Sequence, residues 1–304
     1  MHFEFAKREK TVTLHAYLSL FMTKSKGAIG IFDSGYGGLS IFREIHKLLP
    51  EYDYIFVGDN ARAPYGDRSF EDVYNYTNQA VSKLFDLGCP LVIIACNTAS
   101  AKALRTIQQC ILPKSADPSK RVLGVIRPTI EKVGNLSYSK HIGIIATQAT
   151  ISSESYILEL NKYAPEIKAS TQACPGWVPL IESGDLNSAE LHDIVKEDIK
   201  TLLNKDPWID TIILGCTHYP LITSLIQRVL QELDVPEIIL MPQGKAVAYS
   251  LKDYLRRHPE IEERLTRIGG TEYFTTGSVE HFDIHATTFI GHQDIVKSKK
   301  IVLE

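Results

Sequence analysis

The sequence of 304 residues lacks several features that mark specialised classes of protein. It contains no run of about 18–20 apolar residues, the length that a helix needs to span a bilayer. It has no strong charge of either sign, because 33 lysines and arginines stand against 36 aspartates and glutamates, and no basic stripe is present. We therefore expect neither a membrane nor a nucleic acid among its partners.

Cysteine is also scarce, and the five cysteines have no paired spacing. An odd, scattered set argues against a disulfide-stapled scaffold and favours a reduced, cytoplasmic protein. No CxxC pair is present to complete a tetrahedral site, so we expect no metal. Residues 1–26 lack the small-x-small cleavage site of a signal peptide. We expect them to form an irregular extension, with Met22 as a candidate natural start.

From Gly27 onward, apolar runs of strand length alternate with amphipathic stretches of helical length, the pattern of an α/β protein with parallel strands. We expect strands at 28–32, 54–57, 91–95 and 122–126, and then at 142–146, 167–173, 211–215 and 237–241. We expect helices at 39–49, 70–87, 99–110, 152–163, 189–203, 221–233 and 245–257. The second series echoes the first, since Ile29-Gly30-Ile31 opens one and Ile142-Gly143-Ile144 opens the other.

This echo indicates an internal duplication. It predicts two pseudo-symmetric, doubly wound α/β lobes with parallel sheets and an active-site cleft between them. A chain that continues after two similar lobes often packs its end on the first. We therefore expect a discontinuous first lobe formed by residues 27–120 and 242–304, with residues 121–241 as the second lobe.

The third strand of each lobe ends in a cysteine, Cys96 in the first and Cys216 in the second. A thiol just past a parallel strand lies near a helix N-terminus, where the dipole and free N–H groups favour the thiolate. A single such cysteine would be interpreted as a small buried hydrophobe. The matched pair indicates function, because polar residues flank both members: Asn97 and Thr98, and Thr217 and His218. Cys174, at another strand end, is expected to be structural.

One alternative chemistry needs only one of the two cysteines. In a thiol hydrolase, Cys96 would be the nucleophile and His218 the base across the cleft. The weakness of this hypothesis is that it leaves Cys216 without a role.

The first strand ends in a glycine-rich loop, Asp33-Ser34-Gly35-Tyr36-Gly37-Gly38. A dinucleotide fingerprint fits poorly, because Ser40 occupies its third glycine position and Asp33 would put a negative charge beside the pyrophosphate. We expect the glycines to let backbone N–H groups approach a small anion such as a carboxylate. Asp33 would then act on a proton or an ammonium group, or alternatively cap the helix at 39–49.

A second loop, Pro64-Tyr65-Gly66, follows the second strand at the same predicted edge of the sheet. Its composition is that of a turn. Its position suggests a substrate contact through the Tyr65 hydroxyl and the Gly66 N–H.

Four motifs, in this order, resemble the bacterial glutamate racemase family. They are Asp33-Ser34-Gly35 with Gly37-Gly38, Pro64-Tyr65-Gly66, Ala95-Cys96-Asn97-Thr98-Ala99 and Gly215-Cys216-Thr217-His218-Tyr219-Pro220-Leu221. The resemblance runs from about Gly27 to about Gly291. It implies a cofactor-independent enzyme that interconverts L- and D-glutamate to supply peptidoglycan synthesis. It also implies two lobes, the first discontinuous, and the homodimer of many relatives.

The resemblance further implies the roles of individual residues. Cys96, assisted by Asp33, would deprotonate D-glutamate, and Cys216, assisted by His218, would deprotonate L-glutamate. Two thiols suit this reaction, because inversion at carbon needs a base on one face and an acid on the other. The residues implied to hold the carboxylates and ammonium are Asp33, Ser34, Tyr65, Gly66, Asn97, Thr98, Thr217 and His218.

Two rivals and one departure accompany this resemblance. A sister enzyme acting on aspartate, a hydantoin or maleate is the closest rival, and an amino-acid-binding protein on the same scaffold is the non-enzymatic one. The sequence departs from many relatives at Met241-Pro242-Gln243-Gly244, where they carry an acidic residue followed by Ser-Gly.

Overall fold

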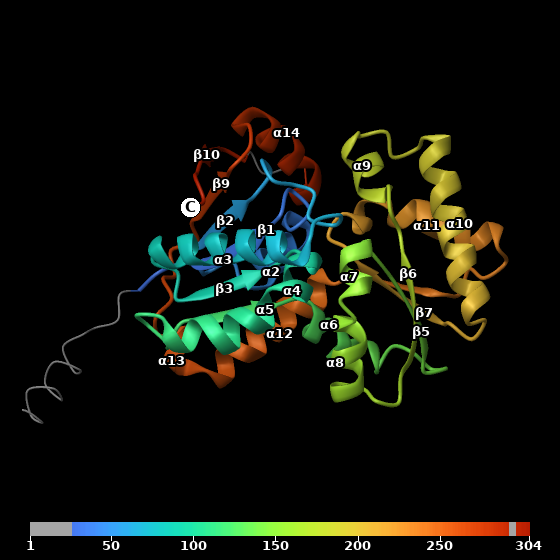
Figure 1. The fold of residues 1–304 in the computed structure, drawn as a ribbon, viewed down its shortest axis with the longest axis horizontal. Helices are drawn as coiled ribbons and strands as arrows, with labels where there is room; N and C mark the ends of the chain where they lie inside the picture. The colour runs from blue at the N-terminus through green and yellow to red at the C-terminus, as the bar shows by residue number, and fades with distance from the viewer. Residues whose placement is uncertain (1–25, 292–295) are drawn as a thin grey trace, which may run out of the picture.

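Two separate parallel sheets organise the computed structural model, which describes residues 26–291 and 296–304 (Figure 1). The first sheet consists of β1 (Ile29–Asp33), β2 (Tyr54–Gly58), β3 (Leu91–Ile94), β4 (Arg121–Gly124), β9 (Thr271–Thr275) and β10 (Ser298–Lys300). The second consists of β5 (His141–Ala146), β6 (Lys168–Ala173), β7 (Thr211–Gly215) and β8 (Ile239–Met241). Neighbouring strands pair in parallel throughout both sheets, so the predicted α/β class is confirmed.

The strand order is β10-β9-β2-β1-β3-β4 in the first sheet and β6-β5-β7-β8 in the second. The run β2-β1-β3-β4 has the same order as the whole second sheet, so β1 is equivalent to β5 and β3 to β7. Gly30 of β1 and Gly143 of β5 both lie close under a helix. An added Cβ would approach a leucine Cδ2 to 3.2 Å at Gly30 and to 2.7 Å at Gly143. The predicted duplication is therefore confirmed by the topology of the sheets.

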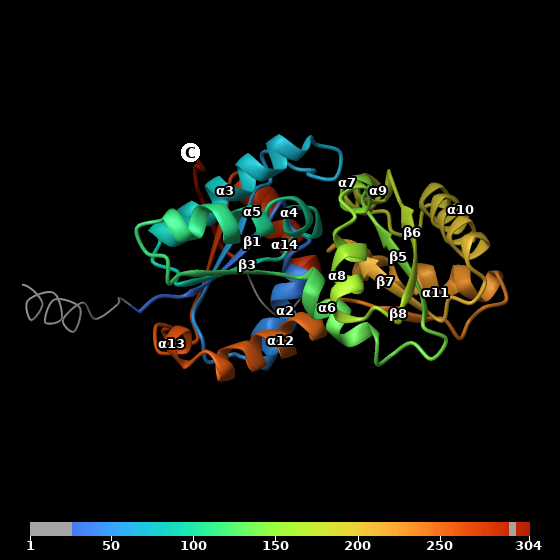
Figure 2. The same ribbon diagram turned by 60° about the horizontal axis from the view of Figure 1, so that its bottom comes forward.

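Helices cover both faces of the first sheet. Figure 2 shows α3 (Phe70–Asp86), α4 (Asn97–Lys102) and α5 (Leu104–Thr106) on one face and α2 (Leu39–Leu48) and α12 (Gly244–Arg257) on the other. Successive residues of β3 enter different cores, since Ile93 packs with α2 and α12 while Ile94 packs with α3. This double burial explains why the strand is an uninterrupted apolar run.

The second sheet is also covered on both faces. The core on one face draws on α9 (Trp177–Glu182), α10 (Ala189–Lys205) and α11 (Thr223–Glu232). The core on the other face draws on α6 (Ile126–Val133) and α8 (Ser155–Tyr163). The short α7 (Gln148–Ser152) lies where this lobe meets the first (Figure 1).

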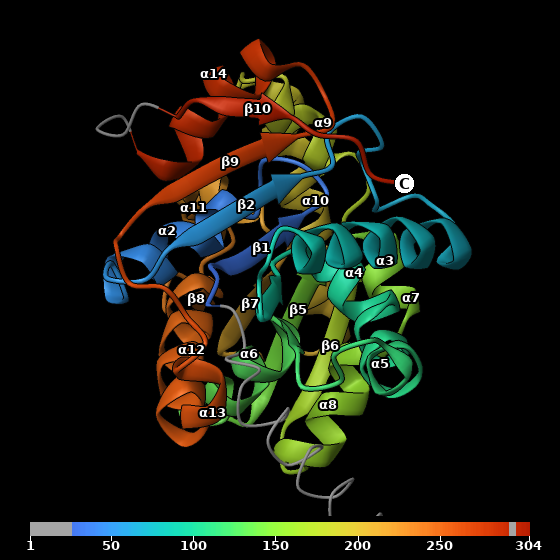
Figure 3. The ribbon, with the colours of Figure 1, turned by 90° about the vertical axis from the view of Figure 1, so that its left-hand side faces the viewer.

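The chain returns to the first sheet after β8. Helix α12 packs against α2, and β9 pairs with β2, followed by β10 at the edge (Figure 3). Helix α14 (Val279–Ile290) packs beside these strands, and α13 (Pro259–Glu262) follows α12. The residues after β8 thus complete the first sheet.

Several predicted boundaries were wrong. Strand β4 pairs with β3, so the first sheet extends to Gly124 and not only to residue 120. The expected strand at 122–126 ends at Gly124, because its last apolar residue, Ile126, already begins α6. The helix expected at 152–163 begins at Ser155, and residue 152 ends the separate helix α7, since Glu154 between them adopts a left-handed φ of 55°.

Other parts of the chain were only partly predicted. The helix expected at 99–110 is divided into α4, α5 and a π-helical turn, η1 (Ile107–Ile111), followed by a short 3-10 turn, η2 (Leu112–Lys114). Helices α6, α7, α9, α13 and α14 and strands β9 and β10 were not expected. The predicted extension lies outside the described residues, apart from Lys26. In the described part of the chain, no helix combines the length and the apolar character that crossing a membrane requires.

Candidate active site

A pocket lies between the lobes, where the carboxyl ends of strands from both sheets meet. This is the position at which parallel α/β sheets bind ligands. Of the residues expected at the site from sequence, all except Asp33 line it: Ser34, Tyr65, Gly66, Cys96, Asn97, Thr98, Cys216, Thr217 and His218. The structure thus brings both strand-end cysteines to one pocket, from opposite lobes.

Cys96 caps the N-terminus of α4 and is 5% exposed. Its Sγ accepts hydrogen bonds from Ser34 Oγ at 3.3 Å and from the Ala99 N–H at 3.5 Å. Burial and the nearby Asp33 carboxylate raise the pKa of Cys96 to about 12, although both hydrogen bonds oppose the shift. The Cys96 sulfur therefore carries a proton at neutral pH in this state of the site.

Cys216 has a different partner. Its Sγ lies 3.8 Å from Nδ1 of His218, whose Nε2 lies 2.9 Å from Oε1 of Glu182. Burial alone would lower the pKa of His218, but its hydrogen bonds to Cys216 and Glu182, and their negative charges, raise it to about 10. The imidazole is therefore positively charged at neutral pH, and it faces the Cys216 sulfur.

Asp33 lies behind the pocket and is completely buried. Its Oδ2 accepts a hydrogen bond from the Gly35 N–H at 3.0 Å. Burial raises the pKa of Asp33, while the positive His218 and hydrogen bonding to the backbone of Gly38 and Gly35 oppose the shift. The N-cap residue of α2 is Gly38 and not Asp33, although the Asp33 carboxylate lies against that residue.

The glycine loop brings the two lobes into contact. A Cβ on Gly37 would lie 2.3 Å from Oγ1 of Thr217 and 2.7 Å from Nδ1 of His218, so only glycine fits there. Ser40, which follows this loop, donates a hydrogen bond from Oγ to the Thr217 carbonyl at 2.9 Å. The loop thus helps to hold the segment that carries Cys216. Its predicted contact with a small anion stays a prediction.

Asn97 and Thr98 also bridge the lobes. The Asn97 amide bonds to Gln243 and Tyr156, both at 2.8 Å. Thr98 Oγ1 lies 3.0 Å from Oγ1 of Thr147, which begins α7 and also lines the pocket. Gln243 belongs to the segment in which the sequence departs from many relatives, so this departure reaches a predicted substrate-binding residue.

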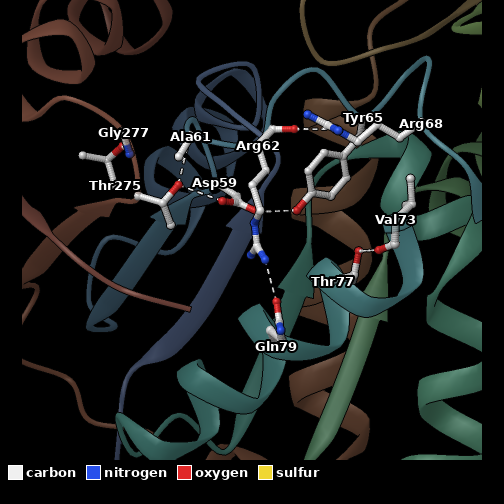
Figure 4. Close-up of polar contacts among 11 residues, drawn as sticks. Asp59, Ala61, Arg62, Tyr65, Arg68, Val73, Thr77, Gln79, Thr275 and Gly277 are labelled. Atoms are coloured by element: carbon white, nitrogen blue, oxygen red, sulfur yellow. Dashed lines mark hydrogen bonds and ion pairs between the residues drawn. The ribbon is translucent and has the colours of Figure 1, made fainter. Parts of the chain in front are cut away.

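The Tyr65 hydroxyl, for which the sequence suggested a substrate contact, has a partner within the protein. Its hydroxyl donates to Oδ2 of Asp59 at 2.5 Å, and Figure 4 shows the ring directed toward that carboxylate. Asp59 is fully buried and also bonds Arg62 at 2.6 Å and Thr276 at 2.7 Å. The Tyr65 hydroxyl therefore anchors its own loop, which leaves the backbone of Tyr65 and Gly66 to meet a ligand.

Two residues that line the pocket were missed or underestimated from sequence. Glu182 was not predicted, because nothing local relates a glutamate at the end of α9 to a histidine 36 positions later. Cys174, predicted to be structural, is 2% exposed yet also lines the pocket. Across residues 26–291 and 296–304, no group of three or more His, Cys, Asp or Glu side chains is arranged to bind a metal.

Comparison with known proteins agrees with this geometry. The sequence profile of the Asp/Glu/hydantoin racemase family matches residues 29–243. A glutamate racemase from Ruegeria sp. (strain TM1040) is 42% identical over 275 residues, 86% of this chain and 96% of that protein. One from Roseobacter denitrificans is 40% identical over 273 residues, again 86% and 96% of the two chains.

Solved structures of glutamate racemases are also similar to this chain. A glutamate racemase from Bacillus anthracis superposes with a TM-score of 0.80 at 32% identity and covers 91% of this chain and 98% of its own. A glutamate racemase from Francisella tularensis, in complex with D-glutamate, gives 0.79 at 30% identity and covers 92% and 98%. With two duplicated lobes, a shared pocket that holds a cysteine from each, and similarity over most of its length, the chain belongs to the Asp/Glu/hydantoin racemase family.

Proposed function

We propose that this chain interconverts L-glutamate and D-glutamate by proton transfer between two cysteines and the α-carbon. The observation that carries the proposal is that Cys96 and Cys216 reach one pocket from equivalent strands of opposite lobes. The choice of glutamate is supported by relatives named glutamate racemase and by the Francisella tularensis protein in complex with D-glutamate.

The two thiols enter the reaction in opposite protonation states. In the L-to-D direction, the Cys216 thiolate, beside positive His218, removes the α-proton from one face. The Cys96 thiol then delivers its own proton to the other face. The reaction leaves Cys216 protonated and Cys96 as the thiolate, the state that D-glutamate needs for the reverse reaction. Asp33 assists proton transfer at Cys96, and His218 assists it at Cys216.

The carbanion between the two transfers needs stabilisation by the site itself. We propose that no pyridoxal phosphate or metal takes part, so hydrogen-bond donors aimed at the substrate carboxylates must supply it. The candidates that line the pocket are Ser34, Asn97, Thr98, Thr217 and the backbone N–H groups of Tyr65 and Gly66. Closure of the pocket around the amino acid would strengthen each of these bonds.

The hydrolase alternative is disfavoured by the position of the histidine. His218 lies beside Cys216, at 3.8 Å, and its other nitrogen is bonded to Glu182. It is therefore the partner of Cys216 and not a base for Cys96 across the pocket.

We further propose that the product supplies peptidoglycan synthesis and that the enzyme works in the cytoplasm as a homodimer. Both sulfurs must stay reduced for the mechanism, which a cytoplasmic environment ensures. The described cysteines are all free, in agreement with this requirement. Light scattering of the purified protein would test the dimer.

The deciding experiment measures racemisation with purified protein, a chelator and no added pyridoxal phosphate. Chiral chromatography would follow L- and D-glutamate and, separately, L- and D-aspartate. We expect both glutamate enantiomers to approach an equal mixture while aspartate reacts far more slowly. Turnover of aspartate but not glutamate would replace the proposal with the sister activity, and binding without turnover would replace it with a binding protein.

A further inference from the structure

Gln243 is a buried polar residue at the junction of the lobes for which the proposed mechanism has no role. It lies between β8 and α12 and is 1% exposed. Its Oε1 accepts a hydrogen bond from Asn97 Nδ2 at 2.8 Å. Its Nε2 donates to Thr129 Oγ1 at 2.9 Å and to the Tyr156 hydroxyl at 2.8 Å. These three partners come from α4, α6 and α8, so one side chain joins three helices.

The two hydroxyls determine which way the Gln243 amide faces. The Tyr156 hydroxyl donates to Asn97 Oδ1 at 2.8 Å, and the Thr129 hydroxyl donates to the Val125 carbonyl at 2.8 Å. A hydroxyl has one hydrogen, so each can only accept from Gln243. Gln243 must therefore present its NH₂ group to both hydroxyls and its oxygen to Asn97.

The same reasoning determines the orientation of Asn97. Its Oδ1 faces the Tyr156 hydroxyl, and one hydrogen of its Nδ2 is used by Gln243. The second Nδ2 hydrogen is the side-chain donor that remains for the pocket, which Asn97 lines. A reversed amide would break two hydrogen bonds at once, because donor would face donor and acceptor would face acceptor.

We propose that Gln243 is a positioning residue that, together with Tyr156, makes Asn97 present an N–H group and not its oxygen to a carboxylate of the bound amino acid. This inference rests on the proposed function, which supplies the carboxylate. An Asn97 amide without these partners could turn over, and its oxygen would then repel the substrate. The specific consequence is weaker binding of substrate, with the proton-transfer steps little changed.

A purely structural role of this network predicts something different. Loss of any member would then lower stability and affect binding alike, whichever neighbour it contacts. The positioning role predicts a rise of KM that loss of a buried hydrogen bond outside the network does not share. Gln243 and Tyr156 bond to Asn97 directly, and Thr129, whose own hydrogen goes to the Val125 carbonyl, fixes the orientation of the Gln243 amide.

The test compares three nearly isosteric variants, Gln243→Met, Tyr156→Phe and the matched control Thr77→Val, at a buried threonine outside the network and the pocket whose hydroxyl donates to the Val73 carbonyl. For each, kcat and KM would be measured with both glutamate enantiomers, and thermal unfolding would be followed separately. We expect all three to unfold at lower temperature. We expect KM to rise about 5–10-fold in Gln243→Met and Tyr156→Phe, with kcat within about threefold, and to stay within about twofold in Thr77→Val.

The outcomes separate this inference from the function on which it rests. An inactive wild-type protein would overturn the proposed function and this proposal with it. An active wild type whose Gln243→Met and Tyr156→Phe variants keep the wild-type KM would overturn the positioning role alone. So would an equal rise of KM in Thr77→Val. If Gln243→Met does not fold, Tyr156→Phe provides the same test with the Gln243 amide intact.

Discussion

Cys96 and Cys216 occupy equivalent places in the two lobes, but their surroundings differ. Cys96 accepts hydrogen bonds from a hydroxyl and a backbone N–H, and it lies near the carboxylate of Asp33. Cys216 has an imidazole beside it. The first environment raises the pKa of the thiol, and the second places a positively charged imidazole against the sulfur.

This difference shows how a duplicated fold supports a reaction that needs unlike partners. Symmetry of the sheets delivers two thiols to opposite sides of one pocket. In the proposed mechanism, neighbouring side chains then make one the base and the other the acid. Because enantiomers have equal free energies in water, kcat/KM must be the same in both directions for any variant. A difference between the Cys96 and Cys216 sites must therefore be measured through the isotope effects in the two directions of the reaction.

Removing either thiol is expected to have the largest effect. Cys96→Ser and Cys216→Ser should each lower kcat/KM by about 10²–10⁴-fold, because a serine hydroxyl is a far weaker acid and its proton transfer is slow. The measurement is racemisation in heavy water followed by proton NMR. In the wild type, deuterium should enter the product before it enters the substrate. Cys110→Ser, at an exposed cysteine, is the control and should be unaffected. Full activity in either active-site variant would refute the two-thiol scheme.

Replacing the side chain that assists one cysteine should slow proton transfer on the side of the substrate that this cysteine faces. His218→Asn and Asp33→Asn should each lower kcat/KM by about 10–100-fold, within the range of acid–base assistance. In His218→Asn, the step at Cys216 becomes rate-limiting, so the isotope effect with α-deuterated L-glutamate should rise and that with D-glutamate should fall. Asp33→Asn should show the opposite. Equal changes with both enantiomers, in both variants, would contradict the assignment of partners to thiols.

Glu182→Gln should have a smaller, pH-dependent effect. Glu182 helps to raise the pKa of His218 to about 10. The positive charge of His218, which assists Cys216 in the proposed mechanism, is lost as pH rises through that value. Without the carboxylate the pKa falls, so the alkaline limb of kcat/KM should move toward neutral pH, with a loss of about tenfold above pH 8. The full pH–rate profile is the measurement.

The matched control for this change is Glu232→Gln. Glu232 Oε1 lies 3.0 Å from Nε2 of His192, a histidine–glutamate pair on α10 and α11 whose residues do not line the pocket. Its profile should coincide with that of the wild type. An alkaline limb that stays in place in Glu182→Gln would show that His218 is not the group responsible for it.

Much of the fold could be predicted because the relevant signals are local and periodic. Strands buried on both faces give continuous apolar runs, and their alternation with helices gives parallel sheets. The repeat of Ile29-Gly30-Ile31 at Ile142-Gly143-Ile144 correctly indicated the equivalent strands. The strand expected at 122–126 was too long because apolar character continues unchanged from the end of β4 into α6.

The candidate site could be predicted only where chemistry is carried by adjacent residues. Cys96 with Asn97, and Cys216 with His218, each form a motif that is visible in the chain. Gln243 and Asn97 lie 146 positions apart, and no local pattern relates them. Contacts of this kind are set by how helices pack, so they require the structure.

Tyr65→Phe is expected to have the smallest effect on catalysis, and it tests whether the Tyr65 hydroxyl contacts the substrate. Because the hydroxyl bonds Asp59 at 2.5 Å, its loss should lower stability by about 1 kcal/mol, while kcat and KM change by less than about threefold. Tyr54→Phe is the matched control: both tyrosines are 1% exposed, and the Tyr54 hydroxyl donates to the Leu49 carbonyl at 2.7 Å, in the core. Urea unfolding and steady-state kinetics would give both quantities. A tenfold rise of KM in Tyr65→Phe alone would mean that its hydroxyl leaves Asp59 for the substrate, and the first lobe would then bind glutamate through a side chain that turns inward on binding.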